Sequence, residues 1–437
     1  APASRPPLTD EQPRETSVVV RIRPLLAEEQ EAGIFPVTAV SGASVTLLEP
    51  RFTVKKRPAV NKHTFRADHV LPGGADVRTD TPPMGVTDEA LYDCCARSLT
   101  ELAMRGGVST LFAFGQTGSG KTYTISHIQR QLATDNEATA SAVCIEMFMS
   151  IFELCGDSAN DLLNEHRPVQ ILEDVVGDIQ VTGLREERLA SVAQCQALFD
   201  EAAKFRRTAS TERNASSSRS HAVARIRMEN RAVSEAEPGL LTLIDLAGSE
   251  RHQDSQHHDA ARLAETRLVN ASLMTLKDCM RHRALALGGN GAAGKGSGYV
   301  HIPFRRSRLT TLLKETFDLE ARRPCRTCVI ACVSPGVHDI AHSLNTLRYV
   351  APIRVVRPAN AARPPVDRRD PSTWSHKQFA KWLKATSHDC VSVDKLAPNQ
   401  ETGLQMVRLP EAEFMRRCLQ CNGISEKKAK DLYVSFW

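Results

Sequence analysis

Long apolar runs are missing from this sequence. No run of about 18 consecutive apolar residues occurs among its 437 residues, so we expect no membrane-spanning helix. The N-terminal segment APASRPPLTDEQPRE also lacks the apolar core of a signal peptide. Its proline, threonine and glutamate content instead predicts a disordered arm over residues 1–16. We therefore expect a cytoplasmic protein with no membrane partner.

The net charge and the cysteine content exclude few further classes of partner or site. The net charge of +5 suits an acidic protein partner and suits nucleic acid equally well. The twelve cysteines, without a signal peptide, are typical of reduced cytosolic thiols. Cys325/Cys328 and Cys418/Cys421 have the C-x-x-C spacing, but a zinc site needs four ligands that meet in space. The first pair leads into an apolar strand and the second lies on an amphipathic helix, so we interpret them as buried thiols.

The most informative stretch is GQTGSGKT at residues 115–122, which matches the phosphate-binding pattern G-x-x-x-x-G-K-[ST]. The apolar run Val108–Phe114 before it predicts a buried strand. Backbone N–H groups of such a loop surround a β-phosphate, Lys121 reaches between the β- and γ-phosphates, and the Thr122 hydroxyl binds Mg²⁺. Thr122 would also open a helix, whose N-terminus favours anions.

Two later segments have the chemistry of a nucleotide switch, NASSSRSH at residues 214–221 and LIDLAGSE at residues 243–250. Asp245 ends an apolar strand and can hold the Mg²⁺ shell through water, and the Gly248 N–H can sense a γ-phosphate. Arg219 and Glu250 are an opposite-charge pair that could join the two loops. Taken singly, the serine run would be read as a flexible loop and Asp245 as a turn residue. Three such segments in order favour the nucleotide interpretation.

With these segments, the chain resembles the kinesin motor family over residues 17–356. The phosphate loop and both switch patterns, N-x-x-S-S-R-S-H and D-L-A-G-x-E, are present. Four further matches are RIRP at 21–24, VNASL at 269–273, HIPFR with SRLT at 301–310, and NTLRY at 345–349. The resemblance implies an α/β P-loop NTPase fold, with a central sheet flanked by helices on both faces.

The resemblance also implies ATP or ADP and Mg²⁺ as cofactors, and ATP hydrolysis stimulated by microtubules. The implied catalytic residues are Ser217, Ser218, Arg219, Gly248 and Glu250. The implied Mg²⁺ ligands are Thr122, Ser218 and, through water, Asp245. The implied nucleotide-binding residues are Arg21, Arg23, Pro24, Gly115, Gln116, Thr117, Gly118, Ser119, Gly120, Lys121, Thr122, Tyr123, Asn214 and Asp245, with Tyr123 stacking on the adenine.

Within the family, the chain looks closest to kinesin-13, whose members shorten microtubules from their ends. Lys277-Asp278-Cys279 resembles that class's K-E-C, and residues 49–65 align without gaps to its long second loop. The class has Lys-Val-Asp at the tip of this loop, whereas this chain has Thr53-Val54-Lys55. The implied partner is tubulin, with no nucleic acid, on a cytoskeletal array that could be a spindle or a flagellum. The implied tubulin-binding residues are Lys55, Lys56, Arg57, Lys277, Asp278, Cys279, Arg305 and Arg308.

Two other functions stay open. A plus-end-directed walking kinesin would need a neck linker and a coiled coil, but VAPIRVVRP at 350–358 has two prolines and no heptads follow it. A non-catalytic microtubule-binding protein would have lost switch residues. Lys121, Arg219, Asp245 and Glu250 are all present, which disfavours that alternative.

The pattern predicts four segments along the chain: the arm at 1–16, a motor domain at 17–356, a Pro/Arg-rich linker at 357–371, and a small all-α domain at 372–437. The last resembles a sterile alpha motif domain and would bind a protein partner or itself. Expected strands are 18–22, 108–114, 142–153, 222–228, 240–245 and 327–333. Expected helices are 87–105, 192–205, 264–287, 307–317 and 340–353.

Overall fold

The computed structural model describes residues 16–53, 55–73, 78–79, 88–143, 145–174, 177, 179–213, 219–231, 237–249, 260–287, 301–317, 323–353, 371, 374–407, 409–421 and 423–436. The chain divides into two compact units, one within Ala1–Val169 and Gly183–Arg357 and the other within Gln170–Thr182 and Pro358–Trp437.

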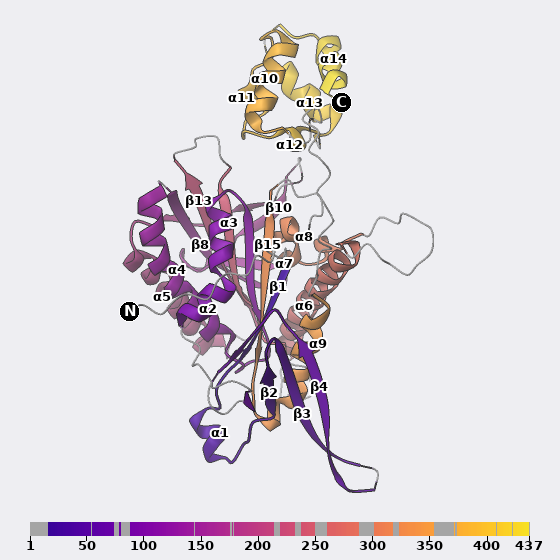
Figure 1. Ribbon diagram of the computed structural model, residues 1–437. Coiled ribbons are helices and arrows are strands. Elements are labelled where there is room, and N and C mark those ends of the chain that lie inside the picture. The colour runs from indigo at the N-terminus through magenta and orange to yellow at the C-terminus, as the bar shows by residue number, and fades with distance from the viewer. Residues whose placement is uncertain are drawn as a thin grey trace. The chain divides into compact units, whose positions relative to one another are not determined.

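The first unit is built on a nine-stranded mixed sheet with the order β12-β8-β13-β14-β7-β15-β1-β5, and with β9 paired to β8 (Figure 1). From β14 to β5 the neighbouring strands are parallel, whereas β13, β8, β9 and β12 join antiparallel. The carboxyl ends of β7 and β14 therefore meet at one edge, where ligands of such sheets bind. The strands are β1 (Thr16–Ile22), β5 (His69–Pro72), β7 (Val108–Phe114), β8 (Ile145–Cys155), β9 (Ser158–Asp161), β12 (Glu187–Arg188), β13 (His221–Asn230), β14 (Gly239–Asp245) and β15 (Cys325–Val333).

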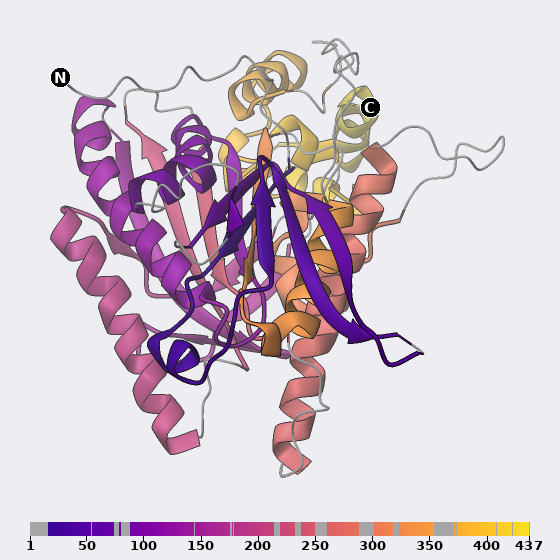
Figure 2. The ribbon, with the colours of Figure 1, turned by 60° about the horizontal axis from the view of Figure 1, so that its bottom comes forward.

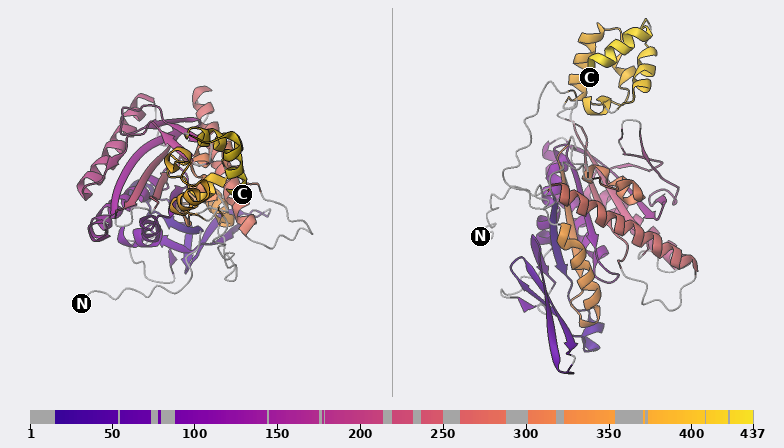
Figure 3. Two further views of the ribbon diagram at one scale, coloured as in Figure 1. Left: turned by 90° about the horizontal axis from the view of Figure 1, so that it is seen from above. Right: turned by 90° about the vertical axis from the view of Figure 1, so that its right-hand side faces the viewer.

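Every residue of the central strand β7 is buried, and alternate side chains of a strand point to opposite faces. Both faces of the sheet are therefore covered, and helices provide the cover. Leu111 and Ala113 face a core that includes residues of α2 (Asp88–Cys95), α3 (Arg97–Met104), α4 (Lys121–Val143) and α5 (Val192–Arg213). Phe114 faces the other way and stacks on Tyr349, with ring centroids 3.9 Å apart. That face carries α6 (Ala260–Leu287), α7 (Arg308–Leu312), α8 (Lys314–Phe317) and α9 (Ile340–Val350), and Figure 3 shows α6 and α9 running along it.

A smaller sheet extends from the same unit. It has the order β4-β3-β2-β6 and includes β2 (Thr38–Ser41), β3 (Ser44–Phe52), β4 (Pro58–Arg66) and β6 (Arg78–Thr79). Strands β3 and β4 form a long hairpin that projects from the rest of the unit (Figure 2). The short helix α1 (Ala27–Glu31) lies between β1 and β2 in the sequence.

The second unit contains the strand pair β10 (Gln170–Glu173) and β11 (Ile179–Thr182) and five helices. Phe379, Leu383, Phe414, Cys418 and Phe436 are fully buried in the core that these helices share. A capping box between Ser375 and Gln378 starts the first of them. The helices are α10 (His376–Ser387), α11 (Val393–Leu396), α12 (Gly403–Val407), α13 (Glu411–Leu419) and α14 (Glu426–Phe436).

Several predicted element boundaries were wrong. The predicted helix 87–105 is interrupted at Ala96, whose φ of −121° is not helical. The predicted strand 142–153 begins only at Ile145, since the alanine-rich end of α4 continues to Val143. The predicted helix 192–205 continues to Arg213, and the predicted helix 264–287 already begins at Ala260. The predicted helix 307–317 is divided at Leu313, and the predicted helix 340–353 ends at Val350 and is followed by a 3₁₀ turn. The strands β2, β3 and β4 were not predicted as strands.

The described residues include no helix long and apolar enough to cross a membrane. Among these residues, the sole group of three or more His, Cys, Asp or Glu side chains close enough to share a metal is Glu29, His338 and Asp339, and Arg23 pairs with both of its carboxylates. The C-x-x-C pairs do not contribute to such a group. Of the described cysteines, Cys390 alone is exposed. Cys325 is only half-buried, contrary to the prediction, whereas Cys328, Cys418 and Cys421 are buried.

Candidate functional site

The loop from Gly115 to Gly120 joins β7 to α4, and hydrogen bonds to the carbonyl of one of its own residues hold it closed. The Gln116 carbonyl accepts hydrogen bonds from Ser119 Oγ at 2.8 Å and from Lys121 Nζ at 2.9 Å. A Cβ at Gly115 would lie only 2.3 Å from the Cys332 carbonyl oxygen, so a larger residue there would displace the loop. Ser119 is fully buried, and its hydroxyl holds the loop rather than facing outward.

Asp245 lies beside this loop because β14 runs parallel to β7 and places Asp245 opposite Ala113. Thr122 Oγ1 donates a hydrogen bond of 2.7 Å to Asp245 Oδ2. Asp245 Oδ1 is buried and has no hydrogen-bond partner within the part of the chain described. A threonine hydroxyl next to a carboxylate with an unused oxygen is a donor set that Mg²⁺ and its water ligands prefer.

Arg206 lies beside the same carboxylate and was not predicted from the sequence. Its guanidinium is buried, pairs with Asp245 Oδ2 at 3.2 Å, and donates a hydrogen bond to the Ser220 carbonyl at 2.5 Å. The Ser220 hydroxyl donates in turn to Glu153 Oε2 at 2.9 Å. Arg206 lies just past the predicted end of α5 at Phe205 and belongs to no recognised motif, so no sequence signal marked it.

The loop after Asp245 is held against the end of β7. The N–H groups of Leu246 and Ser249 donate to the carbonyls of Ala113 and Gly115, at 3.4 and 3.2 Å. Gly248 lies between these two residues, so its N–H remains the predicted contact of a terminal phosphate. Arg219 is half-buried. Asn214, Ser217, Ser218 and Glu250 lie outside the described residues.

Of the predicted adenine contacts, Arg21 and Tyr123 are arranged to meet a base, whereas Arg23 supports the phosphate loop. The Arg21 guanidinium lies over the Tyr123 ring, 4.9 Å from its centroid, and this ring is 54% exposed. An exposed aromatic ring backed by a cation suits stacking with a base. Arg23 instead donates from Nε to the Gly118 carbonyl at 2.8 Å and pairs with Glu29 at 2.6 Å, so it holds the phosphate loop. Pro24 is exposed.

The described residues therefore fit a bound nucleotide and Mg²⁺. The loop supplies the glycines and the lysine, Thr122 and Asp245 supply oxygens, and Tyr123 supplies an open ring. Gln116, Thr117 and Gly120 lie in the same loop between β7 and α4.

The Arg23–Glu29 pair predicts an acid-sensitive part of the stability. Hydrogen bonds from the Arg23 guanidinium lower the pKa of Glu29 from 4.5 to about 2. Since the folded pKa is below the unfolded one, the stabilisation is present above pH 4.5 and is lost as the pH falls toward 2. We expect Glu29→Gln to lower the melting temperature at pH 7, with a difference from wild type that shrinks on acidification. Glu31→Gln, at an exposed position of the same helix, is the control. It should leave the melting temperature equal to that of wild type both at pH 7 and at acidic pH. A Glu29→Gln difference that stays constant with pH would contradict this assignment.

The candidate tubulin residues differ in exposure. Lys55, Lys56 and Arg57 are exposed in the turn of the β3–β4 hairpin. Arg305 and Arg308 are exposed as well, whereas Lys277 and Asp278 on α6 are half-buried, with the Lys277 ammonium 5.4 Å from the centroid of the Tyr349 ring. Cys279 is fully buried, and burial raises the pKa of its thiol to about 12. The structure thus places the Cys279 side chain in the core rather than on the surface.

Comparison with known proteins matches residues 21–356 to a family model described as the kinesin motor domain. The diatom spindle kinesin-1 of Cylindrotheca fusiformis is 38% identical over 298 residues, which make up 68% of this chain and 43% of the relative. The kinesin-like protein KIN-13B of Arabidopsis thaliana is 31% identical over 355 residues, or 79% of this chain and 48% of the relative. The chain thus spans about half the length of these curated relatives.

Solved structures agree with these matches. KIF14 residues 391–755, with ADP in complex with a microtubule, superpose with a TM-score of 0.64 at 28% identity and cover 82% of this chain and 99% of that one. A KIF14 dimer with AMP-PNP on a microtubule superposes with a TM-score of 0.61 at 25% identity, covering 80% and 98%.

Proposed function

Because the chain belongs to the kinesin motor family, we propose that it is an ATP-hydrolysing microtubule motor, and specifically a depolymerase of the kinesin-13 type that acts at filament ends. The ATPase proposal rests on one observation. Thr122 donates a hydrogen bond to Asp245 at the place where the loop after Asp245 bonds to the start of the phosphate loop. Microtubule-stimulated release of phosphate from ATP tests the proposal.

In this proposal, the N–H groups of the loop and Lys121 hold the phosphates, while Thr122 and Asp245 hold Mg²⁺. When bound, Mg²⁺ neutralises charge on the phosphate oxygens. Ser217, Ser218 and Gly248 close around the γ-phosphate, Arg219 pairs with Glu250, and Glu250 accepts a proton from the attacking water through a water relay. Positioning and charge stabilisation lower the barrier without a covalent intermediate.

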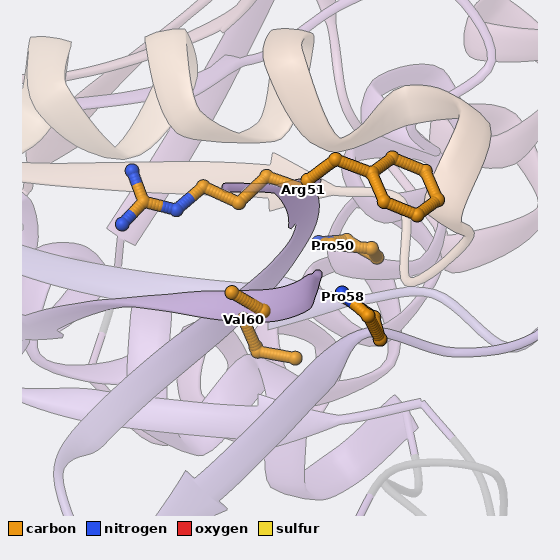
Figure 4. Close-up of a pocket in the computed structure, with 6 residues that line it drawn as sticks. Pro50, Arg51, Pro58 and Val60 are labelled. Atoms are coloured by element: carbon orange, nitrogen blue, oxygen red, sulfur yellow. The ribbon is translucent and has the colours of Figure 1, made fainter. Parts of the chain in front are cut away.

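The depolymerase proposal is supported by the β3–β4 hairpin and by the likeness to KIN-13B. The tip is a defined turn, because Thr53 Oγ1 accepts from the Arg57 N–H and donates to the Arg57 carbonyl, both at 3.1 Å. Phe52 is 78% exposed beside three cationic side chains. An apolar hollow of about 310 Å³ adjoins the turn (Figure 4), lined by Pro50, Arg51, Phe52, Pro58, Ala59 and Val60.

A plus-end-directed walker is the second candidate function within the kinesin motor family. Imaging of stabilised microtubules with this protein and ATP separates the two functions. Shrinking ends support the depolymerase, and steady movement along filaments of constant length supports the walker. Binding to microtubules without any ATP turnover would favour the non-catalytic alternative.

We further propose that residues 372–437 form an interaction module resembling a sterile alpha motif domain, after a motor domain at 17–356 and a linker at 357–371. Helices α10 to α14 and their shared apolar core support this. Its partner would be another protein or a second copy.

The charge at the hairpin tip leads to a prediction about end activity. The exposed run Lys55, Lys56 and Arg57 should bind the acidic lattice tightly and in a salt-sensitive way, because exposed charges are screened by salt. We expect wild type to shorten microtubules slowly and Lys55→Asp to shorten them faster, with weaker lattice binding at low salt. Measurements are shortening rate by time-resolved imaging and co-sedimentation at two salt concentrations.

The matched control is Lys56→Asp, which removes the same charge one residue further along. Thr53 should be left unchanged, since its hydroxyl closes the turn. Equal shortening by both variants would mean that total charge, rather than a carboxylate at position 55, sets the rate.

A further inference from the structure

The buried residue His221 connects two parts of the first unit that the proposed mechanism treats separately. It begins β13 and is 1% exposed. Its Nδ1 accepts the N–H of Ala247 at 3.0 Å, in the loop that follows Asp245. Its Nε2 lies 2.8 Å from Ser272 Oγ on α6. One imidazole therefore bonds both to the loop that carries Gly248 and to the helix that carries Lys277.

The hydrogen bonds fix the tautomer of this ring. A backbone N–H can only donate, so Nδ1 is the acceptor and the proton is on Nε2. Nε2–H then donates to Ser272 Oγ, which donates to the Val269 carbonyl at 2.7 Å. Burial, reinforced by the cations Arg206 and Lys121, lowers the pKa of His221 to about 3. The ring stays neutral at ordinary pH, and both of its bonds persist.

Side-chain alternation explains why His221 reaches α6. Ala224 and Ile226 of β13 face the core shared with α2 to α5, so residues 221 and 223 face the opposite side of the sheet. Ser272 is buried on that side. The contact thus crosses from the sheet to α6 at the point where the Asp245 loop begins.

We propose that His221 is a positioning residue that couples the Asp245 loop to α6, so that a displacement of this loop by the terminal phosphate of the nucleotide moves the helix. The coupling rests on the proposed ATPase function. The hydrogen bonds that the His221 ring makes to described residues go to Ala247 and Ser272, neither of which is a predicted phosphate ligand or tubulin residue. Loss of these bonds should therefore separate the response to microtubules from the basal reaction.

A second connection to α6 provides a matched control. Tyr349 Oη, also buried, donates to the Leu273 carbonyl of α6 at 2.8 Å. Its ring stacks on Phe114 at the end of β7, not on the Asp245 loop. Tyr349→Phe removes one buried hydrogen bond to the same helix turn while leaving the loop connection intact.

The test uses the full chain with Ser272→Ala and His221→Asn. Ser272→Ala removes the hydroxyl that His221 contacts, and Asn at 221 retains an acceptor for the Ala247 N–H but is too short to reach Ser272. In Ser272→Ala we expect basal ATP turnover and the KM for ATP to stay within about twofold, while microtubule stimulation falls by about 5- to 150-fold, the usual range for coupling between sites. His221→Asn alters the switch segment 214–221 itself, so its stimulation is compared with its own basal rate and should fall to the same extent. The double variant should lose no more than either single variant, since both break one bond. Tyr349→Phe should keep most of the stimulation.

Hydrogen–deuterium exchange provides a readout without microtubules. In wild type, exchange over residues 269–280 should differ between the ADP and AMP-PNP complexes, and in Ser272→Ala this difference should vanish. Equal losses of basal and stimulated turnover, additive losses in the double variant, or an unchanged exchange difference would each overturn the coupling role. A wild-type chain without microtubule stimulation contradicts the proposed function instead, and the exchange measurement still decides the role of His221.

Discussion

Replacing Glu250 with alanine is expected to abolish ATP turnover while ATP binding remains. The Ser249 N–H donates to the Gly115 carbonyl, so the residue before Glu250 is held against the start of the phosphate loop. A carboxylate placed there can accept a proton from the attacking water, and losing such a group usually costs about 10²- to 10⁴-fold in rate. Phosphate release with saturating microtubules measures turnover, and a fluorescent ATP analogue measures binding.

Lys121→Ala is the companion variant, because Lys121 places its charge among the phosphates rather than at the attacking water. It should weaken nucleotide binding itself. If Glu250→Ala also lost binding, Glu250 would be a structural residue and the proton-acceptor role would be wrong.

Replacing Arg417 with alanine is expected to unfold most of the helical part of the second unit. The Arg417 guanidinium is 9% exposed and bonds to Glu401 Oε1 at 2.9 Å, to the Leu396 carbonyl and to Glu413. Glu401 is 3% exposed, so the substitution leaves a buried carboxylate without its cation. Breaking a buried pair in this way costs about 3–5 kcal/mol, comparable with the whole stability of a small domain.

Tryptophan fluorescence can report this change in the full chain. All three tryptophans, at 374, 382 and 437, occur in the C-terminal segment. Urea titration followed by their emission should show a markedly lower midpoint for Arg417→Ala. Arg416→Ala is the control, since Arg416 binds the same Glu413 from an exposed position and should change the midpoint little. Equal shifts for both variants would show that the buried pair with Glu401 is not what matters. Basal ATP turnover should be unaffected in both.

The sequence predicted the strand, the loop and the helix around the phosphate-binding pattern because their signals are local. The residues from Gly115 to Thr122 are consecutive, and the order of strand, loop and helix around them follows from apolar runs and glycine positions. The central α/β sheet and the two-sided helical cover were confirmed for the same reason.

What the sequence could not show depends mainly on contacts between distant residues. Arg206 reaches Asp245 across 39 positions, and the pairing of His221 with Ser272 spans 51. Cys279 occurs within a pattern resembling a tubulin-binding motif, yet the buried face of α6 encloses its side chain. The hydroxyl of Thr53 closes the hairpin turn, a role that a comparison of loop letters does not reveal. Burial and tertiary hydrogen bonds decide the first three cases, and a local side-chain hydrogen bond decides the fourth.

The exposure of Cys390 makes the chain suited to site-specific labelling. Cys94 is only half-buried, but burial raises the pKa of its thiol and so slows its reaction with maleimide near neutral pH. Limited maleimide treatment should therefore modify Cys390 preferentially among the described cysteines. A dye at that position, paired with a fluorescent nucleotide bound near Tyr123, would form a donor–acceptor pair spanning both units. Single-molecule energy transfer could then follow how the separation between the units changes during each round of ATP hydrolysis.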